Sequence, residues 1–317
     1  MIRFQEILLL CGMSLWLGTG MAVTLSAQEA SDQARNSIGR LQTWDSSPAP
    51  SQRDEDINQL LPNFRVLRNG TSDREWKESG LQRLQQIRLT SSGRKTAQKV
   101  CDEMSLYRHL PEVRFEIDPE TYDYFIGNPD LVVSMWQAMG ISAIGLKQVS
   151  QYQYQMNNTD GTDCKFFYLK RSQNANVVYC QGKFQSPVLK NPIEAEGVVC
   201  VYTKFEKHPD GTTFALHSAD AFIAFENGAI ETAAKLTSPI SNYIADRNFQ
   251  EISLFMHSMH LSMARQPSWV QELTGRIEPV MPERAQEFDQ LTLEVYKRNQ
   301  ARLAQSLDER EDPVLIR

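Results

Sequence analysis

Alternating apolar and polar positions predict a run of strands through the middle of the chain. Residues 113–117 alternate between apolar and charged side chains, and residues 151–156 alternate between glutamine and tyrosine or methionine. Period-two alternation is typical of strands with one buried face. Further short apolar runs are separated by turn residues such as those at 160–161. We therefore expect strands at residues 113–117, 151–156, 165–169, 177–180, 197–202, 213–216 and 221–225.

Apolar residues spaced by three and four predict helices on both sides of these strands. Two short helices start at Asp118-Pro119 and Asn128-Pro129, where a capping residue is followed by proline in the first turn. The longest helix carries one apolar stripe that includes Phe255, Met256 and Met259. The expected helices are residues 72–87, 94–109, 118–127, 128–140 and 247–265, with a short one around residues 268–273.

The order of these elements predicts an α+β fold. Strands at short intervals joined by tight turns pair antiparallel. We expect an antiparallel sheet of about six to seven strands that grips a long C-terminal helix, with added N-terminal helices.

The N-terminus has the charge and hydropathy pattern of an export signal. Arg3 precedes an apolar run over residues 7–23, and the small residues Ser26 and Ala27 follow. Cleavage after Ala27 is one outcome; retention of the apolar run as a membrane anchor is the other. Membrane contact is expected only through this segment if it is uncleaved. The rest of the chain is expected in the periplasm, the cell envelope or the extracellular space.

Composition shifts divide the chain into four parts. We expect a signal peptide at residues 1–27, a polar and proline-containing linker at 28–62, an α+β domain at 63–275 and a charged helical tail at 276–317.

Composition and charge exclude several classes of protein. The 317 residues are 41% hydrophobic and carry a net charge of -6. The mean hydropathy of -0.43 excludes a polytopic membrane protein. An acidic chain without a basic stripe lacks the charge that nucleic acid binding needs, so we expect no nucleic acid partner. No cofactor is expected, because dinucleotide and phosphate-loop motifs are missing.

Export changes the interpretation of the cysteines. Cys101, Cys164, Cys180 and Cys200 follow the signal, and four cysteines allow two disulfides. Cys180 and Cys200 lie in consecutive expected strands and are the first candidate pair. The alternative is four buried thiols that act as small apolar side chains.

The order of elements over residues 113–265 resembles the helix-grip fold of the START-like, polyketide-cyclase-like superfamily. The resemblance rests on the strand at 115–117, the two helices between Asp118 and Gly140, the strand series and the long helix. It implies a curved sheet around a long helix, with apolar ligands held between them. It carries over no catalytic residue, because no motif matches.

Two groups of residues are candidates for a site. Phe255, Met256, Met259, Met263 and Trp136 are expected either to line an apolar pocket or to form ordinary core. His257 and His260, three residues apart on the long helix, could approach one metal ion with His217 and Asp220. The alternative places these histidines on the flank of an apolar helix.

These observations leave three hypotheses for function. The first is an exported, non-enzymatic protein that binds an apolar small molecule or lipid. The second is an interaction or structural protein of the envelope, and the third is a metal-dependent or hydrolytic enzyme. The missing nucleophile and phosphate-binding motifs favour the first two.

Overall fold

The computed structural model describes residues 63–157, 163–184, 193–225, 239–277 and 281–311. The expected signal, linker and last residues lie outside this part. Its sheet has nine strands, against the six to seven expected from the sequence, and every pairing is antiparallel. The strands are β1 (Phe64–Arg68), β2 (Leu106–His109), β3 (Glu112–Glu116), β4 (Gly145–Ser150), β5 (Gln153–Asn157), β6 (Asp163–Lys170), β7 (Ala175–Phe184), β8 (Ile193–Lys207) and β9 (Thr213–Phe225).

The strands follow one another across the sheet with a single rearrangement. The order is β1-β3-β9-β8-β7-β6-β5-β4, so β4 to β9 form a meander and β3 lies beside the last strand. β2 pairs with the part of β9 that β3 leaves free. The segment from 213 to 225, expected as two strands, is one continuous strand because it spans both partners.

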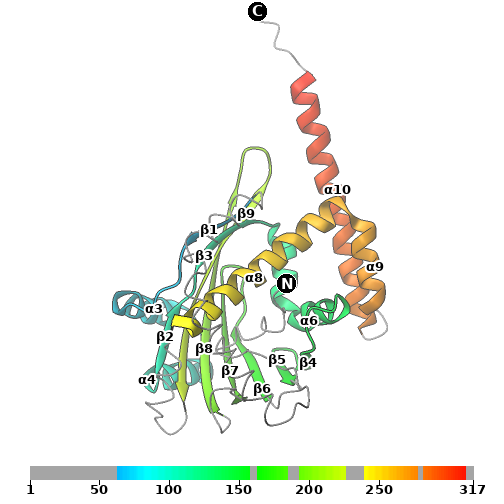
Figure 1. Cartoon of the computed structure of the whole chain (residues 1–317). Coiled ribbons are helices and arrows are strands. Elements are labelled where there is room, and N and C mark those ends of the chain that lie inside the picture. Colours follow the sequence, from blue (N-terminus) through cyan, green and yellow to red (C-terminus); the bar gives the residue numbers. More distant parts are fainter. Residues whose placement is uncertain (1–62, 158–162, 185–192, 226–238, 278–280, 312–317) are drawn as a thin grey trace, which may run out of the picture.

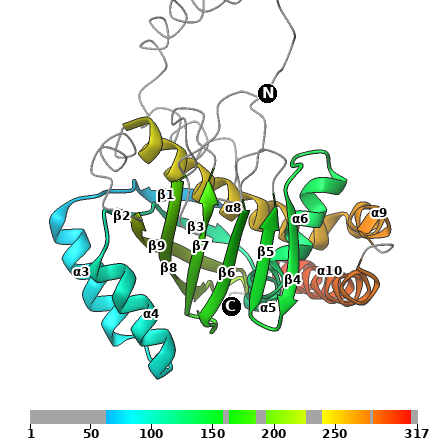
Figure 2. The ribbon, with the colours of Figure 1, turned by 90° about the horizontal axis from the view of Figure 1, so that it is seen from below.

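Helices cover both sides of the sheet (Figures 1 and 2). On one side lies α8, a helix of 27 residues that packs on β1 and β3. We call this the helix-facing side, and the opposite side the outer side, on which two helices near the N-terminal end of the domain pack. The helices are α3 (Arg74–Gln86), α4 (Ser91–Asp102), α5 (Pro119–Gly127), α6 (Pro129–Ala138), α8 (Pro239–Arg265), α9 (Pro267–Ile277) and α10 (Pro282–Glu311).

Proline positions explain several helix boundaries. α5 and α6 begin at Pro119 and Pro129, as expected from the capping patterns before them. α8 ends at Arg265 because Pro267 disfavours helical geometry at Gln266 and starts α9. Together with β3 and the meander, these helices give the expected order of strand, two short helices, six strands and long helix.

The main hydrophobic core lies between the helix-facing side and five helices. It contains Phe115 and Val199 from the sheet, Met256 from α8 and Phe288 from α10. A second cluster continues along the same side of the sheet on β5, β6 and β7. A third cluster fills the outer side beneath α3 and α4.

The C-terminal region is folded onto this core along part of its length. Phe288 and Val295 of α10 are buried, although the apolar stripe of this helix is thin. The far part of α10 projects from the molecule (Figure 1). Among the helices within the described residues, none combines the length and apolar character that a membrane span requires.

Candidate functional site

The helix-facing side of the central strands carries short side chains. Cross-strand pairs share one face of a sheet, and Val199 pairs with Ala221 while Val201 pairs with Ala219. Gly197 continues this row between Cys180 of β7 and the larger Ile223 of β9. All four side chains of the two cross-strand pairs are apolar, and three of them are buried. The face toward α8 is therefore apolar and shallow in its centre.

His217 is a polar group within this apolar layer. Its exposed fraction is 2%, and its ring stacks on Phe249 of α8 with ring centroids 4.5 Å apart. The Ser253 hydroxyl donates to the Phe249 carbonyl oxygen at 2.9 Å, so the same hydroxyl oxygen accepts from His217 Nδ1 at 2.9 Å. This assigns the proton to Nδ1 and leaves Nε2 as an acceptor.

The acceptor nitrogen of His217 has no hydrogen-bond partner among the described residues. Burial lowers the pKa of His217 to about 3, so the ring is neutral at physiological pH. Thr203 lies opposite His217 on β8, and its hydroxyl is hydrogen-bonded to that of Tyr122. The acceptor Nε2 of His217 and the hydroxyls of Thr203 and Tyr122 thus belong to neighbouring residues on the helix-facing side of the sheet.

The five residues expected to line a pocket belong to one buried cluster. Trp136 of α6 meets Phe255 of α8 edge to face, with ring centroids 5.5 Å apart. Met256, Met259 and Met263 belong to the same cluster, which also holds residues of α5, α9 and α10. Trp136 Nε1 is buried without a hydrogen-bond partner among the described residues. The structure therefore places these five side chains in one cluster. Side chains of α5, α9 and α10 pack in the same cluster.

The residues considered as metal ligands do not converge. His217 and Asp220 are three residues apart on β9, so they point to opposite sides of the sheet. His257 Nδ1 is 2.9 Å from the Glu116 carbonyl oxygen, and Asp220 is bound on the outer side. Within the described residues, no three His, Cys, Asp or Glu side chains are placed to hold a metal ion. The proposed set of four ligands is therefore wrong as a set.

Asp220 is instead the centre of a buried polar network on the outer side. Its exposed fraction is 0%, and its carboxylate accepts from Arg83 of α3 at 2.8 and 3.0 Å. Tyr107 and His109 of β2 approach the same carboxylate, each at 2.8 Å. Burial acts to raise the pKa of Asp220, but these hydrogen bonds and the Arg83 charge lower it below its ordinary value.

This network attaches α3 to the sheet. Trp76 of α3 stacks on His109 with ring centroids 4.4 Å apart, and the Tyr107 hydroxyl also lies 2.8 Å from the Trp76 carbonyl oxygen. Sequence reasoning missed Arg83, Tyr107 and His109 as partners of Asp220. Residues 106–109 show no apolar–polar alternation, so the sequence carried no strand signal that would have placed Tyr107 and His109 beside Asp220.

The candidate disulfide between Cys180 and Cys200 is not formed. In the register of β7 and β8, Cys180 lies opposite Gly197 and Cys200 opposite Val177. The two cysteines face opposite sides of the sheet, and each belongs to a different hydrophobic cluster. None of the four cysteines after the expected signal forms a disulfide; Cys164, Cys180 and Cys200 are buried thiols, as in the alternative interpretation, and Cys101 is half-buried.

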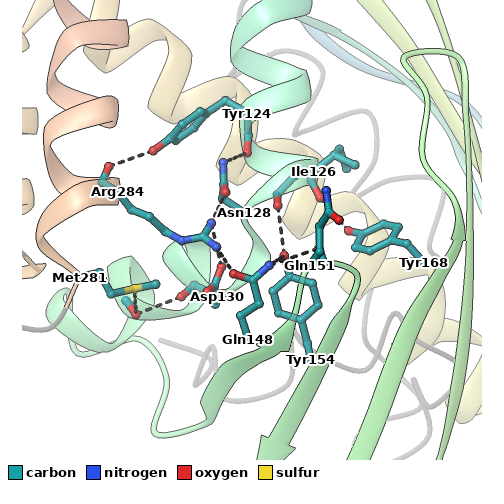
Figure 3. A network of polar contacts seen from close by, with 12 residues as sticks. Tyr124, Ile126, Asn128, Asp130, Gln148, Gln151, Tyr154, Tyr168, Met281 and Arg284 are labelled. Carbon is teal, nitrogen blue, oxygen red and sulfur yellow. Dashed lines mark hydrogen bonds and ion pairs between the residues drawn. The ribbon is translucent and has the colours of Figure 1, made fainter.

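A second polar network joins the C-terminal helices to the α5–α6 junction (Figure 3). Arg284 of α10 forms an ion pair with the buried Asp130 at 3.2 Å, and its Nη2 donates to Gln148 Oε1 at 2.5 Å. Arg284 also bonds the Asn128 side chain, and its carbonyl oxygen accepts from Tyr124 at 2.9 Å. Burial raises the pKa of Asp130, and the Arg284 charge opposes that shift. These contacts fix the start of α10 rather than forming an open site.

Comparisons with known proteins give only distant similarity. No protein-family profile matches the chain, and no curated protein matches it. A putative uncharacterized protein from Rhizobium leguminosarum aligns with 47% of this chain and 95% of its own, at 17% identity and a TM-score of 0.27. Ara h 8.0201 aligns with 46% of this chain and 99% of its own, at 11% identity and a TM-score of 0.26.

Proposed function

We propose that this chain is an exported, non-enzymatic protein that binds an apolar small molecule or lipid between the sheet and α8. The expectation of export comes from residues 1–27, which lie outside the described residues. The proposal concerns the helix-facing side of β7, β8 and β9. It is carried by one observation, the shallow apolar face that these strands turn toward a long helix.

Residue size supports this proposal. Ala219, Ala221 and Gly197 are the small members of the helix-facing rows, and the larger Ile223 and Phe225 follow on the same side of β9. Short side chains opposite a long helix leave part of the layer to be filled by other groups. The unpartnered Nε2 of His217 would accept a hydrogen bond from a hydroxyl of a mainly apolar ligand.

A second candidate function is an interaction or structural protein without a ligand. It is favoured by the packing of Trp136, Met256 and Met263, which are buried among neighbouring helices. In that case side chains fill the layer, and the projecting part of α10 would contact a partner (Figure 1).

Ligand content distinguishes the two functions. The full chain, with its own N-terminal segment, is expressed in a bacterial host and purified from the periplasm without detergent. Native mass spectrometry followed by solvent extraction is expected to show a stoichiometric apolar molecule. A mass that corresponds to protein alone would contradict the binding proposal and favour the second function.

A pair of filling variants tests the location of the ligand. Ala221→Leu places a larger side chain on the helix-facing side of the sheet. Ala224→Leu is the matched change on the outer side, where Ala224 packs in the third cluster. Ala221→Leu is expected to displace the ligand with little loss of stability, whereas Ala224→Leu costs about 1–3 kcal/mol by overpacking. Equal destabilisation by both changes, with ligand content unaltered by Ala221→Leu, would place the ligand elsewhere.

A further inference from the structure

A separate polar cleft opens between α8, α10 and the turn that joins β8 to β9. Its volume is about 570 Å³, which suits a small organic molecule. It lies away from the central strands to which the proposed function is assigned. The lining residues that matter here are Glu116, Asp118, Lys207, His260, Arg265 and Arg302.

The floor of the cleft holds two buried hydrogen-bonding groups. Glu116 is 4% exposed, and its Oε2 accepts from Asn63 Nδ2 at 2.7 Å. Its Oε1 is 3.6 Å from Arg302 Nη2, which is too long for a hydrogen bond. His260 is 5% exposed, and its Nδ1 has no hydrogen-bond partner among the described residues. Glu116 can therefore accept a hydrogen bond from a ligand, and His260 Nδ1 can accept or donate one according to its tautomer.

The charges around this floor are balanced by the protein itself. Asp118 accepts from Arg298 at 3.2 Å, and Arg302 is the cation nearest Glu116. Burial lowers the pKa of His260 despite the neighbouring carboxylates Glu116 and Asp118, which favours the neutral ring. Hydroxyl groups suit this floor better than an ammonium group, which would bring an unbalanced charge into a buried site.

The rim of the cleft carries an excess of positive charge. Lys207 and Arg265 are exposed, and neither side chain has a partner among the described residues. Asp210 lies beside them and already accepts from the Thr212 backbone N–H at 2.9 Å. Two cations against one carboxylate favour an anionic group at the rim, although the chain as a whole has a net charge of -6.

We infer that this cleft binds a small hydroxylated anion, with its hydroxyls toward Glu116 and His260 and its anionic group toward Lys207 and Arg265. A sugar phosphate and a hydroxycarboxylate share this chemistry. The inference is independent of the proposed apolar site, because its residues are Glu116 of β3, Lys207 at the end of β8 and His260 and Arg265 of α8, none of which is assigned to that site.

Calorimetry on the purified full chain tests the inference with defined probes. Glucose 6-phosphate and citrate represent the two sources of a hydroxylated anion, and glucose and inorganic phosphate represent its two halves. At least one of the first pair is expected to bind with a Kd about tenfold or more below that of either half. Absence of saturable binding by both, up to about 10 mM, would overturn the inference. So would binding of glucose 6-phosphate no tighter than that of glucose, together with no saturable binding of citrate.

A matched pair of lysines separates this site from general attraction of anions. Lys207→Ala is expected to weaken binding about tenfold, whereas Lys204→Ala leaves it unchanged. Lys204 is exposed on the same strand and pairs with Glu206 at 3.0 Å, outside the cleft. Both positions are at the surface, so both variants are expected to fold. Equal weakening by the two changes would show unspecific charge attraction and contradict the site.

Discussion

Asp220 and His217 lie three residues apart on β9, but the structure favours the charged form of Asp220 and the neutral form of His217. Asp220 is held as a carboxylate because Arg83, Tyr107 and His109 donate to it. His217 receives no such compensation on the helix-facing side, so burial keeps its ring neutral. The difference arises because Asp220 faces donors on the outer side of the sheet, whereas His217 faces the apolar layer on the helix-facing side.

This arrangement predicts an acid-sensitive stability that originates at His217. The pKa of this ring is about 3 in the folded protein and about 6.5 in the unfolded chain, so only the unfolded chain gains its proton between these values. The free energy of unfolding should fall by about 1.4 kcal/mol per pH unit from this group as the pH decreases through that range. His217→Gln should remove this part of the slope in urea unfolding measured from pH 7 downward.

An exposed histidine provides the control for this prediction. His208→Gln, in the β8–β9 turn, is the matched surface change and is measured in parallel. His260 contributes equally in both variants. An unchanged slope in His217→Gln would show that His217 becomes protonated without unfolding.

At the level of elements, the outer side depends on a close approach of α3 to the sheet. A Cβ atom added at Gly80 would lie 3.0 Å from Tyr107 Oη and 3.1 Å from Asp220 Cγ. Glycine is unfavourable inside a helix. It is accommodated at position 80 because the Asp220 network leaves no space there for a side chain.

Two glycine-to-alanine changes should therefore have opposite effects. Gly80→Ala should lower the free energy of unfolding by about 1–3 kcal/mol, because the added methyl group displaces the network. Gly275→Ala in α9 meets no atom within 4 Å and should raise stability by about 0.5–1 kcal/mol. Chemical denaturation measures both, and stabilisation by Gly80→Ala would show that α3 can move outward at no cost.

Elements with a strong local pattern were predicted well, and edge elements were not. The strand at 113–117, the helices that start at Pro119 and Pro129 and the long helix all occur near their expected positions. β1 and β4 were missed because both lie at edges of the sheet, where half-exposed side chains weaken the alternation. Residues 106–109 were expected to be helical but form β2, since pairing with β9 outweighs local propensity.

At the level of the whole molecule, Arg284 connects the C-terminal helices to the rest of the domain. Asp130 is buried and has Arg284 as its ion-pair partner, so removal of the guanidinium leaves a buried carboxylate without compensation. The same side chain bridges to β4 through Gln148, as Figure 3 shows.

We expect Arg284→Ala to loosen α10 before the sheet unfolds. Loss of a partner from a buried ion pair costs about 3–5 kcal/mol, and the Arg284 side chain also bonds Asn128 and Gln148. Hydrogen exchange should accelerate over residues 282–295 and leave β7 to β9 unchanged. Arg276→Ala, an exposed change on α9, is the matched control and should leave exchange in α10 as it is. Uniform acceleration over the entire domain would instead indicate that α10 and the sheet unfold together.

The sequence alone determined the class of fold, because alternation and three-and-four spacing are local consequences of burying one face of each element. It also determined that Phe255, Met256, Met259, Met263 and Trp136 are apolar partners for the interior, which the structure gathers in one cluster. Only the tertiary structure decided which polar residues meet. Asp220 lies 137 positions from Arg83, and its separation from His217 depends on which face of β9 each residue occupies. Such contacts depend on strand register and helix placement, which are set by the packing of the whole chain rather than by neighbouring residues.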